Sequence, residues 1–179
     1  NNGLDDFYMC GAKGAAGTLY KQKSNGFEAS NIALFQEEKL SEETDCVFFD
    51  ADNDNDLDLY VTCGSLEFPS SSSALIDKLY LNDGNGRFTT SNQILPSFTF
   101  ESTSCARPSD VDGDGDLDLA VGNSTQANQV YRNDGGTLTP SAVWSSDGAA
   151  ETSSIAWGDY DGDGDLDLAV GNHQEANLV

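Results

Sequence analysis

The sequence predicts an all-β protein made of repeated antiparallel sheets, and three observations predict this fold. Three acidic segments match one another and start 60 and then 49 residues apart, a spacing typical of repeat proteins. They are DADNDNDLDLYV from Asp50, DVDGDGDLDLAV from Asp110 and DYDGDGDLDLAV from Asp159. Alternating apolar residues follow each segment, and 18 glycines against four prolines suit short strands joined by tight turns.

A strand is expected on each side of every acidic segment. After the third one, Leu166, Leu168 and Val170 point one way while the residues between them point the other way. Residues 46–50 and 154–159, which precede two of the segments, are rich in β-forming side chains. Each acidic segment is therefore predicted to be the loop of a β-hairpin.

A second landmark completes each repeat. The segments Leu79–Phe88, Val130–Leu138 and, more loosely, Leu19–Phe27 indicate a strand, a glycine turn and another strand. About four strands per repeat is the content of a propeller blade. We expect one propeller segment over 1–179, a portion of a longer propeller, with repeats at about 1–45 (partial), 46–104, 105–153 and 154–179 (partial). Residues 36–45 and 65–77 are predicted loops.

The acidic loops are predicted calcium sites. Carboxylates stand at positions one, three, five, seven and nine of each loop: Asp50, Asp52, Asp54, Asp56 and Asp58; Asp110, Asp112, Asp114, Asp116 and Asp118; and Asp159, Asp161, Asp163, Asp165 and Asp167. Ca²⁺ takes about six to eight oxygen ligands, which such a loop can supply. Glycine at position six, replaced by Asn55 in the first loop, permits the sharp turn.

An EF-hand, a magnesium site and a solvated turn fit these loops less well. An EF-hand needs Glu at position twelve, where this chain has Val61, Val121 or Val170. Mg²⁺ is the weaker metal candidate because it retains several waters. A merely solvated acidic turn is the remaining alternative, but five carboxylates in nine residues with no Lys or Arg among them repel one another strongly.

The pattern D-x-D-x-D-G-x-x-D followed by a Leu-rich strand resembles the FG-GAP and VCBS-type repeats of integrin-α-like β-propellers. The Tyr-x-Asn-Asp-Gly turns at Tyr80 and Tyr131 look like the bacterial and cartilage-acidic-protein branch of that family. The resemblance implies side-chain ligands at positions one, three, five and nine, with position seven giving its backbone oxygen and its carboxylate facing water. In the N-terminal copy only Asn2 and Asp6 match, so calcium there is a weaker expectation.

Charge and composition limit the classes of function and partner that this chain can have. A net charge of −23 makes nucleic acid and anionic membranes poor partners, and no apolar stretch has the length of a bilayer. We expect a secreted or cell-surface calcium-binding domain with a structural, adhesive or filament-forming role, whose partners are proteins, matrix or other copies. No enzyme is expected, because the single histidine, His173, lies in a polar loop. The alternative is a carbohydrate-binding or polysaccharide-lyase propeller, with Trp144 and Trp157 as candidate sugar contacts.

Four cysteines favour an oxidising compartment, with buried thiols as the alternative. The repeat phase favours disulfides Cys10–Cys46 and Cys63–Cys105, each between neighbouring blades. The competing scheme pairs Cys46 with Cys63 across one hairpin. Asn123 carries the single Asn-x-Ser/Thr sequon and is a predicted glycosylation site.

Overall fold

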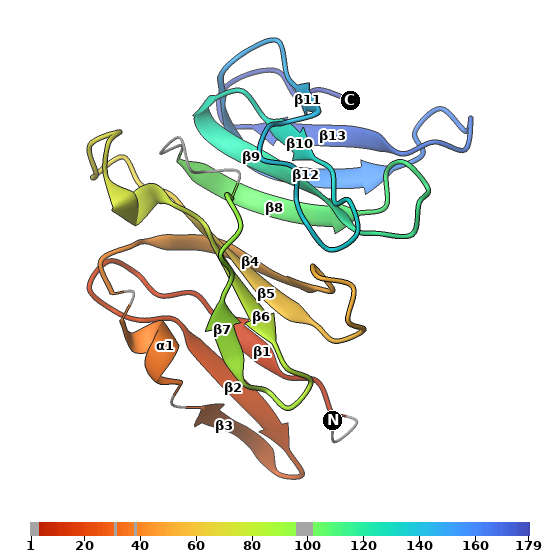
Figure 1. The fold of residues 1–179 in the computed structure, drawn as a ribbon. Helices are drawn as coiled ribbons and strands as arrows, with labels where there is room; N and C mark the ends of the chain where they lie inside the picture. The colour runs from red at the N-terminus through yellow and green to blue at the C-terminus, as the bar shows by residue number, and fades with distance from the viewer. Residues whose placement is uncertain (1–3, 31, 38, 96–101) are drawn as a thin grey trace.

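The computed structural model describes residues 4–30, 32–37, 39–95 and 102–179, which form sheets stacked in chain order (Figure 1). The first sheet has three antiparallel strands in the order β1-β2-β3. These strands are β1 (Phe7–Met9), β2 (Thr18–Lys23) and β3 (Gly26–Ser30). A single helical turn, α1 (Ala33–Gln36), leads to the next sheet.

The second sheet is an antiparallel meander of four strands in the order β4-β5-β6-β7. They are β4 (Glu43–Phe49), β5 (Asp58–Cys63), β6 (Lys78–Asn82) and β7 (Phe88–Thr90). The predicted loop over 65–77 contains the short 3-10 helix η1 (Ser73–Leu75). The loop predicted over 36–45 ends earlier than expected, because β4 already begins at Glu43.

The third sheet repeats this plan, and the fourth begins it again. The third has β8 (Thr103–Ser109), β9 (Asp118–Gln126), β10 (Gln129–Tyr131) and β11 (Trp144–Ser145), and the fourth has β12 (Ala150–Gly158) and β13 (Asp167–Asn172). The end of β9 also pairs with the start of β12, so the third and fourth sheets are two parts of one continuous six-stranded sheet. The prediction of an all-β fold with propeller-like antiparallel sheets is confirmed.

The hydrophobic core lies between the sheets because side chains alternate along each central strand. Leu59 and Val61 on β5 pack with Tyr8 of the first sheet. Tyr60, which lies between them in the sequence, packs with Leu119 of the third sheet. Both faces of β5 are therefore covered, and all six of its residues are buried.

Polar contacts fix neighbouring sheets in register. Arg107 on β8 forms an ion pair with Asp45 on β4 at 2.6 Å. One residue earlier on β4, the Thr44 hydroxyl donates to the Thr103 carbonyl at 2.7 Å. As a result, the hairpin loops of successive sheets project at the same edge of the stack, on the right in Figure 1.

Candidate metal centres

The three acidic loops follow one backbone path. Positions four and six have a positive φ in every loop: Asn53 (63°), Asn55 (70°), Gly113 (78°), Gly115 (99°), Gly162 (79°) and Gly164 (98°). Glycine adopts this left-handed conformation freely, and asparagine tolerates it better than most residues. Asn55 therefore preserves the turn of the first loop. Position four has the same requirement, which the carboxylate pattern alone does not indicate.

The carboxylate at position one is fixed by its own loop. In the second loop, Gly113 and Gly115 donate their N–H groups to Asp110 Oδ1 and Oδ2 at 2.8 and 3.1 Å. The third loop repeats both bonds at Asp159, and in the first loop Asp50 accepts from the backbone of positions five and six. Each loop thus closes around its first aspartate.

The carboxylate at position nine connects the loop to the next hairpin. Asp118 is fully buried; its Oδ2 accepts from Val111 N at 2.9 Å and its Oδ1 from Asn133 N at 2.8 Å. Asp58 accepts the same two bonds, the second from Asn82 N. Asn82 and Asn133 are the asparagines of the two Tyr-x-Asn-Asp-Gly turns, so these turns anchor the loops.

The N-terminal copy keeps one part of this arrangement. Gln22, the counterpart of Asn82, donates its backbone N–H to Asp6 Oδ1 at 2.8 Å. Asp6 therefore occupies the position-nine place in the first sheet. Asn2, the other residue of the weaker expected site, lies outside the described residues.

Carboxylate oxygens from positions one, three and nine converge in each loop to within 4.8 Å of one another. The three groups are Asp50, Asp52 and Asp58; Asp110, Asp112 and Asp118; and Asp159, Asp161 and Asp167. Asp52 Oδ1 is buried and has no hydrogen-bond partner among the described residues. An all-oxygen donor set with an unpartnered buried oxygen fits a hard cation such as Ca²⁺.

Position five lies outside these groups. The exposed carboxylates of Asp54, Asp114 and Asp163 each accept a hydrogen bond from the position-seven N–H of their own loop, at 3.0, 2.9 and 2.9 Å. The structure therefore brings together three of the four expected side-chain ligands in each loop.

The position-seven aspartates differ from the expectation that their carboxylates face water. Asp116 does not simply face water: its Oδ1 accepts from Asn53 Nδ2 of the preceding loop at 2.6 Å, and its Oδ2 accepts from Gly135 N at 2.7 Å. Asp56 is half-buried, and Asp165 is exposed. In the second loop this aspartate therefore links neighbouring sheets as well as lying beside a candidate cation site.

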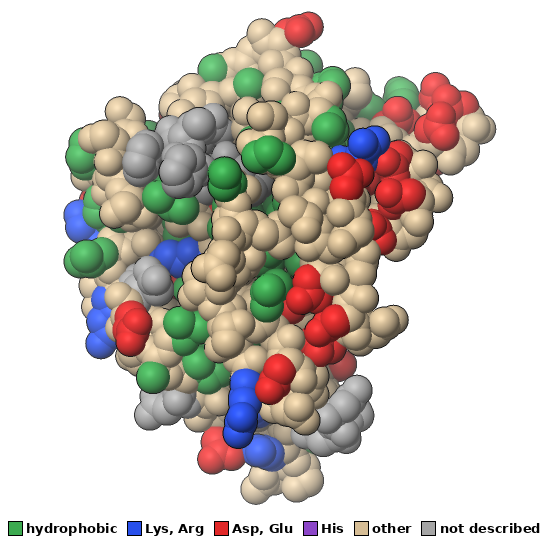
Figure 2. Space-filling view, viewed as in Figure 1, with side chains coloured by type: hydrophobic (Ala, Val, Ile, Leu, Met, Phe, Trp, Pro, Cys, Tyr) green, Lys and Arg blue, Asp and Glu red, His purple; other side chains and the backbone are tan. Residues whose placement is uncertain are grey.

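The three loops produce the acidic edge visible in Figure 2, where red side chains gather on the side from which the loops project. Arg132 is a cation beside this edge, and it forms ion pairs with Asp112 at 3.3 Å and Asp134 at 2.9 Å. One arginine cannot balance so many carboxylates, so their mutual repulsion remains large without a bound cation.

Burial disfavours the charged form of two position-nine aspartates when no metal is bound. It raises the pKa of Asp58 to about 6, against the lowering effect of the hydrogen bonds from Asn82 and Ala51. Burial also raises the pKa of Asp118, where the hydrogen bonds from Asn133 and Val111 oppose it.

We predict that the chelator-treated protein loses stability between pH 4 and pH 7. A pKa raised above the unfolded value means that the fold prefers protonated Asp58, and this contribution is lost as the pH rises through about 6. In urea unfolding, the free energy of unfolding should change less with pH for Asp58→Asn than for the exposed control Asp147→Asn. An equal change with pH in both variants would show that Asp58 does not cause the loss of stability.

The cysteines are free thiols in this structure. Cys10 and Cys46 pack against the same apolar cluster and are electrostatic neighbours. The alternative Cys46–Cys63 pairing is wrong in register, because Cys46 lies opposite Val61 and Cys63 lies opposite Glu43. The Cys63–Cys105 pairing remains untested, and both of these cysteines are buried.

The glycosylation prediction at Asn123 requires correction. Asn123 is completely buried, and its Nδ2 donates to the Ala127 carbonyl at 2.8 Å. Asn172 makes the same bond to Ala176 in the fourth sheet. Asn123 therefore closes the turn between β9 and β10, and the folded chain leaves no room for a glycan on it.

These features define the class of the protein: stacked antiparallel sheets, each repeating a hairpin with an aspartate-rich loop, are those of a propeller-type repeat protein. The family model described as FG-GAP-like repeat matches residues 69–121 and 110–170, more than half of the chain. The chain belongs to the FG-GAP-like repeat family. A comparison with curated proteins gives no match. Among the described residues, no helix has the length and apolar character needed to cross a bilayer.

Proposed function

We propose that this chain is an extracellular repeat domain in which Ca²⁺ stabilises the loops and the stack of sheets. The observation that supports it best is the convergence of three carboxylates in each of three equivalent loops. The family supports a repeat domain of a kind that is typically extracellular. The cation would supply charge neutralisation and hold the loops closed.

The hydrogen bonds around the loops explain how a bound cation would stabilise more than its own loop. Position nine is bonded both to the start of its loop and to the turn after the third strand. Adjacent loops are joined by the Asn53–Asp116 bond and by Asn133 Nδ2, which donates to the Ala51 carbonyl at 3.2 Å. A cation at position nine would therefore stabilise two hairpins and the contact between two sheets.

Calorimetric titration of chelator-treated protein tests this proposal. We predict that Ca²⁺ fills three sites and that Mg²⁺ binds more weakly. Asp118→Asn should lose one site, because it removes a charge from the group and cannot replace a carboxylate ligand. Glu175→Gln, which removes an exposed charge outside the loops, should keep all three. Equal calcium binding by both variants would contradict the assignment.

We further propose a non-enzymatic role with a protein, matrix or self-association partner. His173 is exposed, and its Nδ1 lies 2.9 Å from Glu151 Oε2 in a surface pair. The acidic edge offers a charged surface for a partner, directly or through the bound cations (Figure 2).

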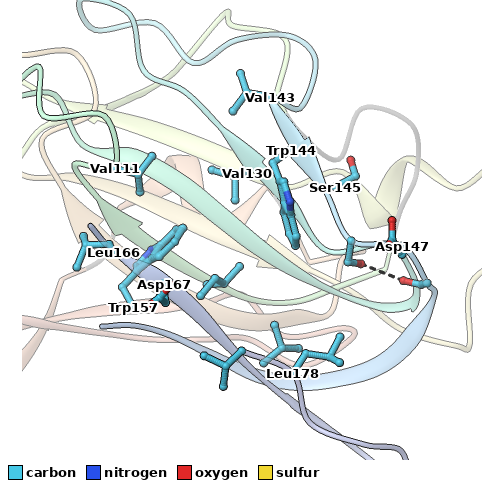
Figure 3. Close-up of a pocket in the computed structure, with 15 residues that line it drawn as sticks. Val111, Val130, Val143, Trp144, Ser145, Asp147, Trp157, Leu166, Asp167 and Leu178 are labelled. Atoms are coloured by element: carbon cyan, nitrogen blue, oxygen red, sulfur yellow. Dashed lines mark hydrogen bonds between the residues drawn. The ribbon is translucent and has the colours of Figure 1, made fainter. Parts of the chain in front are cut away.

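The carbohydrate alternative has weaker support. A cavity of about 630 Å³ between the third and fourth sheets is lined by both Trp144 and Trp157 (Figure 3). Trp157 Nε1 already donates to the Arg107 carbonyl at 3.1 Å, and the remaining walls include Val130, Val170 and Leu178. Most of the lining is apolar, with Ser145, Ser146, Asp147 and Asp167 as its polar side chains, so we retain the structural role.

A further inference from the structure

Two thiols meet where the first sheet packs on the second. Cys10 directly follows β1, and Cys46 lies within β4. Cys46 Sγ lies 3.7 Å from the carbonyl oxygen of Tyr8, two residues before Cys10, and the two thiols are electrostatic neighbours. Both cysteines are partly buried against the apolar cluster that contains Tyr8 and Phe35. The residues are 36 positions apart in the sequence, so the contact belongs to the folded state.

The backbone on both sides of this pair is held in place. Gly11 N donates to Glu43 Oε2 at 2.7 Å, and Glu43 N donates to the Gly11 carbonyl at 3.0 Å. The Tyr8 hydroxyl also donates to the Glu43 carboxylate, at 3.1 Å from Oε1. A disulfide requires Cα atoms within about 7 Å, and the Gly11–Glu43 bonds hold the backbone beside Cys10 against the strand that carries Cys46.

The other two cysteines have different surroundings. Cys63 is completely buried, and burial raises its pKa to about 12. Cys105 packs against Gly122 and Ile155, and burial raises its pKa to about 11. Both of these thiols are buried, whereas Cys10 and Cys46 are partly exposed, so a disulfide reagent reaches Cys63 and Cys105 less readily.

We propose that Cys10 and Cys46 form one exchangeable disulfide that fastens the first sheet to the second, while Cys63 and Cys105 remain thiols. The oxidant is a small-molecule disulfide such as oxidised glutathione. One protein thiolate attacks a sulfur of this reagent and releases one thiol, and the second protein thiolate then displaces the other. The protein loses two protons and two electrons, and the reagent is reduced to two thiols.

This disulfide would act independently of the proposed calcium sites. The first acidic loop begins after Phe49, whereas Cys46 lies opposite Val61 in the interior of the hairpin, and the other two loops belong to later sheets. The link would restrict opening of the first sheet, whose contacts with the second sheet run through Glu43 and the apolar cluster around Phe35.

The test uses the whole chain, reduced and then incubated with oxidised glutathione in saturating calcium. We expect the intact mass to fall by about 2 Da, a Cys10–Cys46 peptide in non-reducing mapping, and two thiols that alkylate only after unfolding. Trypsin cleavage at Lys21 and Lys23 in the first sheet should slow about tenfold on oxidation.

Single cysteine variants identify which thiols form the disulfide. Cys63→Ala and Cys105→Ala should still lose about 2 Da, and Cys46→Ser should instead retain one glutathione adduct on Cys10. A Cys63–Cys105 peptide, or stable adducts on the wild-type chain with no internal link, would overturn the proposal. If a core variant fails to fold, alkylation of the oxidised wild-type protein still distinguishes one disulfide from two.

Discussion

Removing bound calcium is expected to lower the midpoint of thermal unfolding by roughly 20 °C. Calcium at about 100 times its dissociation constant stabilises a protein by about 2.7 kcal/mol per site, and three loops together would contribute about 8 kcal/mol. For a chain of this length, each kcal/mol shifts the midpoint by about 2 to 4 °C. The effect should be large because no Lys or Arg within the loops replaces the lost positive charge.

Thermal melts with calcium, with chelator and after calcium readdition measure this effect. A variant carrying Asp50→Asn, Asp110→Asn and Asp159→Asn changes one converging carboxylate in each loop. Its midpoint should no longer respond to chelator. An unchanged wild-type midpoint, together with no metal in elemental analysis, would refute the calcium proposal.

The fold could be predicted from the sequence because local sequence patterns in each repeat indicate its strands and turns. Alternation around Leu168 and Val170 indicated the strand after the loop, and the matching segments indicated the repeat. Asn55 illustrates why the turn survives a change of residue: the position requires a positive φ, which Asn also adopts.

The contacts between repeats could not be predicted from local patterns. The Asn53–Asp116 bond joins residues 63 positions apart, so only the stacking of the sheets reveals that Asp116 has a partner. The glycosylation prediction at Asn123 had a different cause. It relied on a local sequence motif and did not use the position of Asn123 in the repeat. Aligning Asn123 with Asn172 would have indicated a structural role, because both asparagines donate to the carbonyl four residues later.

Gly136→Ala is expected to destabilise the calcium-loaded protein by about 3 kcal/mol. A methyl group on Gly136 would overlap the Asp52 carbonyl oxygen and lie 2.8 Å from Asp52 C, both backbone atoms of the first acidic loop. The residue also has φ +85°, a conformation that alanine adopts at a cost. The strain and the overlap add, because the loop backbone must move away from the hairpin of the third sheet.

Gly135→Ala is the matched control. Gly135 has φ +63°, but a methyl group there would meet no atom within 4 Å, so only the conformational strain of about 1 kcal/mol is expected. Its backbone N–H would still donate to Asp116. Urea unfolding at saturating calcium measures both variants, and equal losses of stability would show that Gly136 does not hold the two sheets together through Asp52.

Calcium titration of the same two variants separates packing from metal binding. Asp52 contributes the position-three carboxylate of the first loop, so displacing its backbone should weaken that site. We expect Gly136→Ala to lose affinity at one of three sites and Gly135→Ala to retain all three. If Gly136→Ala is destabilised but binds calcium normally, the first loop tolerates displacement, and its cation site does not depend on contact with the next sheet.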